Sequence, residues 1–264
     1  MKKNILAIVC YSKSIDFHGL SDIIKKQLKP FNFDSIIILN NYSEIIYWIK
    51  SGLVVNNVIK VDSNDKYEFS GYLALLEYIE ENKIPFDTLF IVNDTLATHA
   101  PLRLIERLGI FYYFFQKKSI RLKSICGFIH QPIFINQFDL PLYSYFNSKF
   151  FMVGRDSLGL FGDALKFCFT EVDIISGKYV VEWDGDYNGF LKRWLNESTA
   201  PCWYESEPLT DSNKDKFLRK SKCILFEHRL SYYLFTEANS TYIKNIMPGG
   251  IVAKILLTLR KFWW

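Results

Sequence analysis

Through its first hundred residues the chain alternates short apolar runs, rich in Ile and Val, with amphipathic segments of helical spacing. The apolar runs predict buried strands at Ile5–Tyr11, Ser35–Leu39, Val54–Val61 and Thr88–Val92. The segments between them predict helices at Ile15–Leu28, Ser43–Lys50 and Glu68–Asn82. Because strands without polar positions are covered on both faces, this alternation predicts an α/β fold with a mostly parallel, Rossmann-like sheet flanked by helices.

The second part of the chain, from Pro101, continues the pattern less regularly. It predicts helices at Leu102–Gln116 and Ser157–Phe169, strands at Ser124–His130 and Asn147–Val153, and an apolar segment at Cys223–Thr236. The polar stretch Glu205–Lys222 is interpreted as a mobile loop. No repeat or low-complexity linker is present, so we expect one domain over residues 1–246, with a nucleotide-binding half at 1–100 and an acceptor half at 101–246.

Charge and cysteine usage exclude several classes of protein. The net charge is +4, but residues 1–237 balance to zero, because the four basic residues after Glu237 have no acidic counterpart. A nucleic-acid-binding protein would more often carry its basic face within the domain. The five cysteines are widely spaced without a CxxC pair, which is typical of buried free thiols in a reducing compartment. We therefore expect a cytoplasmic protein.

The segment after Met247 differs from the rest of the chain. Following Pro248-Gly-Gly250, apolar residues of 251–263 share one helical face and basic residues lie opposite, with Trp263 and Trp264 at the end. This pattern predicts a basic amphipathic helix over 247–264 that lies on a membrane surface and is too short to span it. The alternative is a helix docked on the core of its own domain.

Polar residues follow each of the four predicted strands. They are Tyr11 and Ser12, Asn40, Asp62, and the triplet Asn93-Asp94-Thr95. Because ligands of open α/β sheets bind beyond the carboxyl ends of the strands, these residues would line one crevice. The triplet offers an amide, a carboxylate and a hydroxyl, which suit the ribose or the metal-bound diphosphate of a nucleotide. Its alternative interpretation is a turn with a helix N-cap.

No glycine-rich phosphate fingerprint is present. The chain lacks GxGxxG after its first strand and lacks GxxxxGK[ST] throughout, which disfavours a dinucleotide dehydrogenase or a P-loop NTPase. The segment Glu68-Phe-Ser-Gly-Tyr72 opens the helix before the triplet. Gly71 either lets a ligand approach closely or permits tight helix–sheet packing.

Four segments together resemble those of bacterial surface-polysaccharide glycosyltransferases, of the rhamnan-synthesis F type and similar O-antigen or capsule proteins. They are Glu68–Tyr72, Asn93–Thr95, Gly127–His130 and Tyr145–Phe151, so the resemblance covers roughly residues 5–170. It implies a GT-A-like fold and a nucleotide-sugar donor. That fold usually carries Asp-x-Asp at the strand end, holding Mg or Mn across the diphosphate. Here Asn93-Asp94 replaces it, which puts the metal in doubt and leaves Asp94 as the main candidate.

Candidates for acid–base chemistry and for acceptor binding lie further along the chain. Asp184 and Asp186, beside Trp183 and Tyr187, are candidate bases next to rings on which a sugar would stack, although Asp-Gly pairs are often turns. Glu227 is another candidate base. His130, Asn147 and Trp183 are candidate acceptor-binding residues, and His99 could supplement a metal site. Lys149 and the pair Arg155–Asp156 could neutralise a diphosphate, with a solvated pair as the alternative.

These observations predict a glycosyltransferase that moves a sugar from a nucleotide-sugar donor to a lipid-linked or growing surface polysaccharide. We expect it at the inner face of the plasma membrane, where its tail would hold the cleft near a lipid-carried acceptor. Two alternatives remain: a non-catalytic scaffold of the same pathway with a degenerate nucleotide-binding fold, and an enzyme that modifies nucleotide sugars.

Overall fold

The computed structural model describes twelve stretches of the chain, at residues 3–10, 17–29, 31–40, 57–61, 66–98, 101–114, 118–130, 135–137, 140–142, 144–170, 210–236 and 242–246. The chain divides into two compact units. The first comprises Met1–Ile129, Asn147–Gly162 and Ala238–Trp264, and the second comprises His130–Phe146 and Asp163–Glu237. The predicted division of 1–246 into a donor half and an acceptor half stays a prediction.

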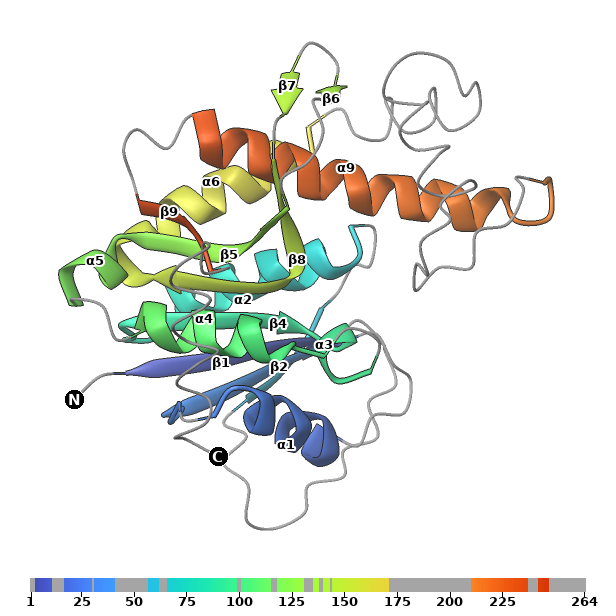
Figure 1. Cartoon of the computed structure of the whole chain (residues 1–264). Coiled ribbons are helices and arrows are strands. Elements are labelled where there is room, and N and C mark those ends of the chain that lie inside the picture. The colour runs from blue at the N-terminus through green and yellow to red at the C-terminus, as the bar shows by residue number, and fades with distance from the viewer. Residues whose placement is uncertain are drawn as a thin grey trace. The chain divides into compact units, whose positions relative to one another are not determined.

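A seven-stranded sheet, in the order β3-β2-β1-β4-β8-β5-β9, forms the centre of the first unit (Figure 1). Its strands are β1 (Asn4–Cys10), β2 (Ser35–Asn40), β3 (Asn57–Lys60), β4 (Thr88–Asn93), β5 (Ser124–His130), β8 (Tyr145–Gly154) and β9 (Tyr242–Asn245). β1 pairs in parallel with β2 and β4, and β2 in parallel with β3. β8 runs antiparallel to β4, whereas β9 is parallel to β5. The predicted α/β class with a mostly parallel, Rossmann-like sheet flanked by helices is confirmed, and the GT-A-like assignment stays a prediction.

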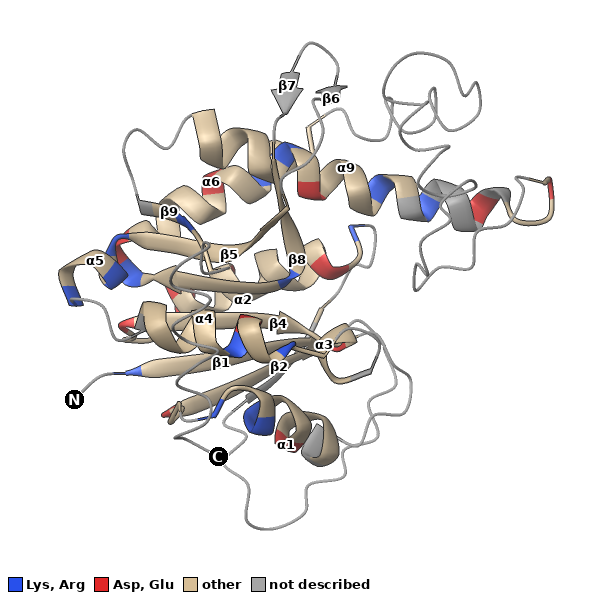
Figure 2. Cartoon of the chain, viewed as in Figure 1, with Lys and Arg blue, Asp and Glu red and all other residues tan. Residues whose placement is uncertain are grey.

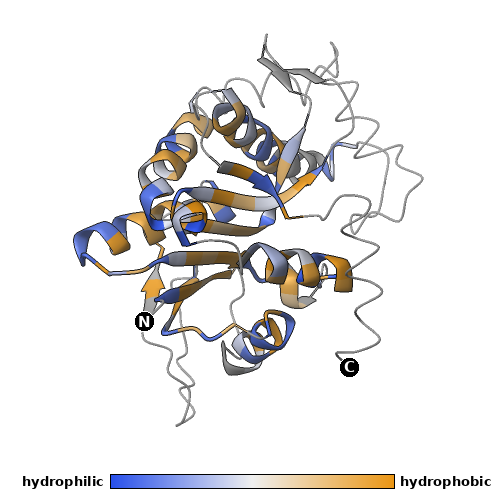
Figure 3. Ribbon diagram, turned by 60° about the vertical axis from the view of Figure 1, so that its left-hand side comes forward, coloured by the Kyte–Doolittle hydropathy of each residue, from blue (hydrophilic) through white to orange (hydrophobic). Residues whose placement is uncertain are grey.

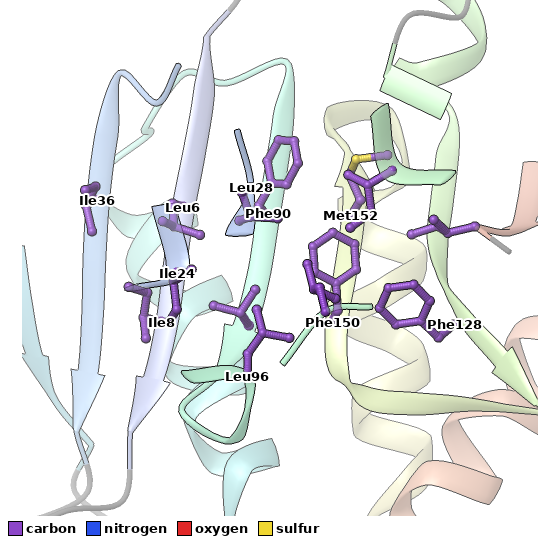
Figure 4. Packing of buried hydrophobic residues seen from close by; sticks show 14 of the residues in the cluster. Leu6, Ile8, Ile24, Leu28, Ile36, Phe90, Leu96, Phe128, Phe150 and Met152 are labelled. Carbon is purple, nitrogen blue, oxygen red and sulfur yellow. The ribbon is translucent and has the colours of Figure 1, made fainter. Parts of the chain in front are cut away.

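Helices cover one face of this sheet and enclose its main core. They are α1 (Phe17–Gln27), the single turn α3 (Thr95–Thr98) and α4 (Leu104–Phe114). Alternate residues of the strands point to this side, because side chains alternate along a strand. Figure 4 shows Ile24 of α1, and Leu28 directly after α1, beside Leu6 and Ile8 of β1, all buried in one cluster. Figures 2 and 3 show the central strands as largely uncharged and apolar.

Helix α2 (Glu68–Glu81) packs on the other face of the sheet. Its buried residues include Phe69 and Tyr72, whose ring centroids are 5.4 Å apart. The ring centroid of Tyr72 also lies 6.0 Å from that of Phe151 of β8. Phe151 in turn contacts Phe161 of α6 (Leu158–Cys168) at 5.3 Å. A side chain at Gly71 would place its Cβ 2.6 Å from Val9 Cγ1, so α2 lies directly against β1.

The short helix α5 (Lys118–Leu122) and the 3-10 turn η1 (Arg155–Ser157) lie at the amino end of β4. Lys118 Nζ is 3.2 Å from a carboxylate oxygen of Asp87, and Arg155 contributes a second, looser contact at 4.0 Å. Arg155 also pairs with Asp156, with half-exposed side chains. The pair Arg155–Asp156 therefore lies at the edge opposite to Asp94, and its alternative interpretation as a solvated pair is correct.

The second unit is built on the long helix α9 (Lys214–Thr236). The backbone N–H of Phe146 donates to Ser231 Oγ at 2.8 Å, and the Phe146 and Phe235 rings stack at 5.4 Å. Arg229 lies 4.7 Å from the ring of Phe167. The unit also contains a small antiparallel pair, β6 (Ile135–Gln137) and β7 (Leu140–Leu142).

The prediction of a loop over Glu205–Lys222 is wrong for its last nine residues, because α9 begins at Lys214. Charge misled the prediction: the first turns of α9 are rich in Lys and Arg, which are good helix formers. Ser221, Ile224 and Leu225 are buried and supply the packed face. The predicted elements at Ser43–Lys50 and 247–264 lie outside the described residues. Within the described ranges, none of the helices has the length and apolar character needed to cross a membrane.

Candidate functional site

The carboxyl ends of β1, β2, β3 and β4 meet at one edge of the sheet. Their registers show this directly, because Cys10 pairs with Asn40 and Val9 pairs with Asn93. The prediction that polar strand ends share one edge is thus confirmed for Asn40 and for the triplet Asn93–Thr95. Tyr11, Ser12 and Asp62, which follow β1 and β3, lie outside the described residues.

The triplet turns the chain from β4 into α3. The backbone N–H of Asp94 donates to the carbonyl of Val9 at 2.9 Å, which fixes this turn to the end of β1. Thr95 Oγ1 donates a short hydrogen bond to Asn93 Oδ1. Asn93 is buried, whereas Asp94 and Thr95 are half-buried. Asp94 also stands at the N-cap position of α3. The alternative interpretation, a turn followed by a helix cap, therefore describes the backbone of the triplet, and the Asp94 carboxylate still belongs to this edge of the sheet.

Two other buried residues, Asn40 and Cys10, lie at the same edge of the sheet as Asp94. Asn40, at the end of β2, is 2% exposed, and the backbone N–H of Val61 donates to its carbonyl at 3.0 Å. Burial raises the pKa of the Cys10 thiol well above its usual value, and the nearby charge of Asp94 adds to the rise. Cys10 is therefore a neutral thiol at this end of β1.

Gln27, which the sequence analysis did not single out, holds the segment after the triplet. Its Nε2 donates to the carbonyl of Leu96 at 2.8 Å, and the backbone N–H of Leu102 donates to its Oε1 at 2.6 Å. Gln27 is 6% exposed, so both bonds are shielded from water. A glutamine in the last turn of a helix gives no sign of this contact in the sequence, because its partners are backbone groups about seventy residues away.

Glu68, a predicted donor-binding residue, begins α2 and lies near the start of β8. Its Oε1 accepts a hydrogen bond from Ser148 Oγ at 3.2 Å, and Tyr72 Oη donates to the carbonyl of Ser148 at 2.6 Å. The residue before Glu68 is Tyr67, with φ of 52° and ψ of −134°. Such a conformation costs a non-glycine residue of the order of 1–3 kcal/mol and is often found at functional sites.

A buried ion pair lies on the α4 side of the same edge. Lys149 Nζ is 3.1 Å from Glu106 Oε1, with side chains 13% and 3% exposed. The other oxygen of Glu106 accepts from the backbone N–H of Arg103 at 2.7 Å, which is the helix-capping bond of a glutamate at the third position of α4. The Lys149 ammonium also lies 4.8 Å from the ring of Phe128. The one sequence signal for Glu106 is its position at a helix start.

Gly71 and Asn147 have identifiable local roles. Gly71 lies against Val9, so helix–sheet packing accounts for this glycine. Asn147 Oδ1 accepts from the backbone N–H of Lys149 at 2.9 Å, as in the local turns that asparagine commonly forms. The role of Asn147 in acceptor binding stays a prediction.

His130 belongs to the second unit, at the end of β5, and its side chain is exposed. It stacks on Tyr145 at 5.2 Å, and Tyr145 contacts His228 of α9 at 4.8 Å. Burial, with a smaller contribution from Glu227, raises the pKa of Tyr145 to about 12. The three rings therefore form an aromatic cluster near Glu227, one of the candidate bases.

The remaining candidates, Trp183, Asp184, Asp186 and His99, lie outside the described residues. Within the described ranges, no group of three or more His, Cys, Asp or Glu residues could hold a metal ion. Asp94 supplies one carboxylate, whereas protein-bound Mg and Ca take several oxygen ligands. The described side chains alone do not form a complete metal site, and a metal at Asp94 stays a prediction.

Comparisons with known proteins identify no family. No family model matches the chain, and no curated protein matches it. Among solved structures, one similar chain is the 2-C-methyl-D-erythritol 4-phosphate cytidylyltransferase of Francisella tularensis, at 11% identity and a TM-score of 0.36. The match covers 66% of this chain and 81% of that one. A similarity of this size carries no weight for function, so the proposal below rests on the residues themselves.

Proposed function

We propose that the chain is a transferase that binds a nucleotide-sugar donor at the carboxyl edge of β1–β4 and passes the sugar to a lipid-linked or growing polysaccharide. The observation that carries the proposal is the convergence of polar residues on this edge. Asp94 is half-buried there between the ends of β1 and β4, with Thr95 beside it and Glu68 at the start of α2. Open α/β sheets bind nucleotides at such an edge.

The side chains at the edge divide into two groups. Asn93 and Asn40 are buried and support the turns, while Asp94, Thr95 and Glu68 retain exposed surface. A carboxylate and a hydroxyl suit the hydroxyl groups of ribose or sugar, since both can accept hydrogen bonds from them. Asp94 is thereby the residue on which donor binding should depend most strongly. The sugar, the nucleotide and the acceptor belong to the resemblance described above and are part of the proposal.

Calorimetric titration with UDP-, GDP-, CMP- and dTDP-sugars, with and without Mg or Mn, tests the proposal. We expect one donor class to bind with micromolar affinity and Asp94→Asn to weaken that binding at least tenfold. Asparagine keeps a residue that caps α3 well, so the substitution removes the charge and little stability. Asp22→Asn, on the exposed surface of α1, is the matched control and should bind as the unmodified protein does.

Failure of a folded sample to bind any of these donors would contradict the transferase and favour the scaffold. Equal binding by Asp94→Asn and the unmodified protein would remove Asp94 from the site. Loss of binding when the metal is withdrawn would assign a divalent ion to the donor. Release of an altered nucleotide sugar without a glycan acceptor would identify the third alternative, an enzyme that modifies nucleotide sugars.

A further inference from the structure

We infer that Lys149 is the residue that contacts the phosphate groups of a nucleotide bound at this edge, and that Glu106 positions it. The inference rests on the proposed function, because it assigns a role within the same site. The position of Lys149 in the sheet is the first support. Val92 of β4 pairs with Phe150 of β8, so Lys149 stands one residue beyond this pair, at the level where β4 continues into Asn93 and Asp94.

The side chains of β8 stop alternating regularly between the two faces of the sheet at this point. Ser148 and Phe151 contact Glu68 and Tyr72 of α2, on one face of the sheet. Lys149 and Phe150, which are consecutive, both contact Phe128 on the other face. Two neighbours on one side are the mark of a β-bulge, a feature that re-aims side chains and is common beside active sites. A regular strand would have turned Lys149 toward α2.

Side chains hydrogen-bond to the backbone where this change occurs. The backbone N–H of Lys149 donates to Asn147 Oδ1, and the carbonyl of Ser148 accepts from Tyr72 Oη. Both backbone groups therefore have a side-chain partner, as buried backbone groups require a hydrogen-bond partner. The local sequence thus maintains a conformation whose effect is to bring the lysine ammonium to the α4 side of the edge.

Glu106 binds this ammonium through one hydrogen bond, and the ammonium keeps N–H donors for a ligand. One N–H of Lys149 donates to Glu106 Oε1, and the Phe128 ring lies beside the ammonium. A lysine has three N–H donors, so two remain for acceptors brought by a ligand. Arg103, whose guanidinium is 3.2 Å from Glu106 Oε1, shares the negative charge. With two cations around one carboxylate, the cluster has a surplus of positive charge that suits a phosphate anion.

The competing explanation is a purely structural ion pair. Buried pairs contribute little net stability, because desolvation offsets their attraction, and replacing both partners by neutral groups is often tolerated. Glu106 has a structural task in any case, since it caps α4 through the N–H of Arg103. The Lys149 ammonium contacts Glu106 and the Phe128 ring, and neither contact caps a helix. The two explanations therefore differ in what the removal of the lysine charge does to phosphate binding.

The experiment compares ligands that differ only in phosphate. The affinities of nucleoside, nucleoside monophosphate and nucleoside diphosphate, for each of uridine, guanosine, cytidine and thymidine, are measured by calorimetry for Glu106→Gln and for Glu106→Gln/Lys149→Met. Glutamine retains an oxygen for the cap of α4, and methionine retains apolar bulk beside Phe128. A nucleoside diphosphate should bind more tightly than its nucleoside, and the ratio of the two affinities measures the contribution of the phosphates. We expect Lys149→Met, added to Glu106→Gln, to reduce this ratio at least tenfold and to leave the nucleoside affinity unchanged.

Lys118→Met is the matched charge control, because Lys118 pairs with Asp87 at the opposite edge of the sheet; it should retain the full ratio. If the methionine variant does not fold, Glu106→Gln/Lys149→Gln replaces it, since two amides can hydrogen-bond each other in the same place. An equal ratio in variants with and without Lys149 would overturn the inference and leave the proposed function standing. Absence of all nucleotide binding by the unmodified protein would overturn both.

Discussion

His228 is a buried histidine in the second unit, with 1% of its surface exposed. Burial lowers its pKa to about 3, well below the ordinary value of 6.5. The folded chain therefore binds fewer protons at this residue than the unfolded chain does between about pH 3 and pH 6.5. The contribution of neutral His228 is fully present above pH 6.5 and is lost as the pH falls toward 3.

This linkage gives a prediction for acid stability. Between pH 7 and pH 5.5 the free energy of unfolding should fall by about 1 kcal/mol more in the unmodified protein than in His228→Gln, which cannot gain this proton. Urea denaturation at the two pH values measures the difference. His130→Gln, which changes an exposed histidine, should keep the slope of the unmodified protein. Identical slopes in the unmodified protein and His228→Gln would show that folding leaves the pKa of His228 at its ordinary value.

At the scale of elements, α4 packs closely against Ile246, the residue that follows β9. A Cβ atom at Gly109 would lie 2.1 Å from the carbonyl oxygen of Ile246, and this backbone atom cannot rotate away as a side chain can. At Gly159, in the first turn of α6, an added Cβ meets nothing within 4 Å. The two glycines are helical residues with opposite surroundings.

Alanine substitution should therefore change stability in opposite directions at these glycines. Gly109→Ala should lower the free energy of unfolding by about 2–4 kcal/mol, because α4 and β9 must separate. Gly159→Ala should raise it by about 0.5–1 kcal/mol, because alanine restricts the unfolded chain and favours the helix. Thermal or urea denaturation of both variants measures the effects. A mild effect at Gly109 would contradict the close packing of α4 against residue 246.

How far the sequence predicts an element depends on where its stabilising contacts lie. β4 and α2 were predicted within a residue or two, because a run of buried Ile, Val and Phe or a helical apolar stripe is a local signal. β9 has only four residues and exists through its pairing with β5, so no local pattern marks it. The start of α9 was missed because its charged residues also suit a loop.

The same distinction applies to the site. The edge containing Asp94 was predictable, because parallel strands align their carboxyl ends whatever their side chains are. The pairing of Glu106 with Lys149 was not, since the two residues are 43 positions apart and meet through a change in strand alternation. Lys149 was named as a possible partner of a diphosphate, but the sequence offered equal grounds for Arg155, which lies at the opposite edge.

At the scale of the whole molecule, the described part of the sheet ends with Ile246, before the basic tail begins. The backbone N–H of Ile246 donates to the carbonyl of Gly127 at 3.0 Å, and its side chain is buried. Removing residues 248–264 therefore leaves every described strand intact. This makes the tail separable from the donor site in an experiment.

We expect the truncated protein to lose binding to anionic liposomes and to keep its affinity for the nucleotide-sugar donor. The physical reason is that the tail carries three basic residues together with aromatic residues suited to the headgroup region. Sedimentation with vesicles containing phosphatidylglycerol, alongside calorimetry, measures both properties. Vesicles of zwitterionic lipid are the control for charge. Unchanged sedimentation after truncation would show that the tail serves the protein's own fold.

The return of the chain to form β9 has a consequence for biosynthesis. Ile129 and Asn245, which bond to each other across β5 and β9, are 116 residues apart. After β5 has been synthesised, the ribosome must therefore translate the whole second unit before β9 is available to pair with β5 at the edge of the seven-stranded sheet. Until then the nascent chain presents a strand edge with unpaired backbone N–H and C=O groups, to which a strand of another chain can pair and cause aggregation. Slow translation over residues 163–237 would lengthen this exposure, so chaperone demand should follow codon choice in that region.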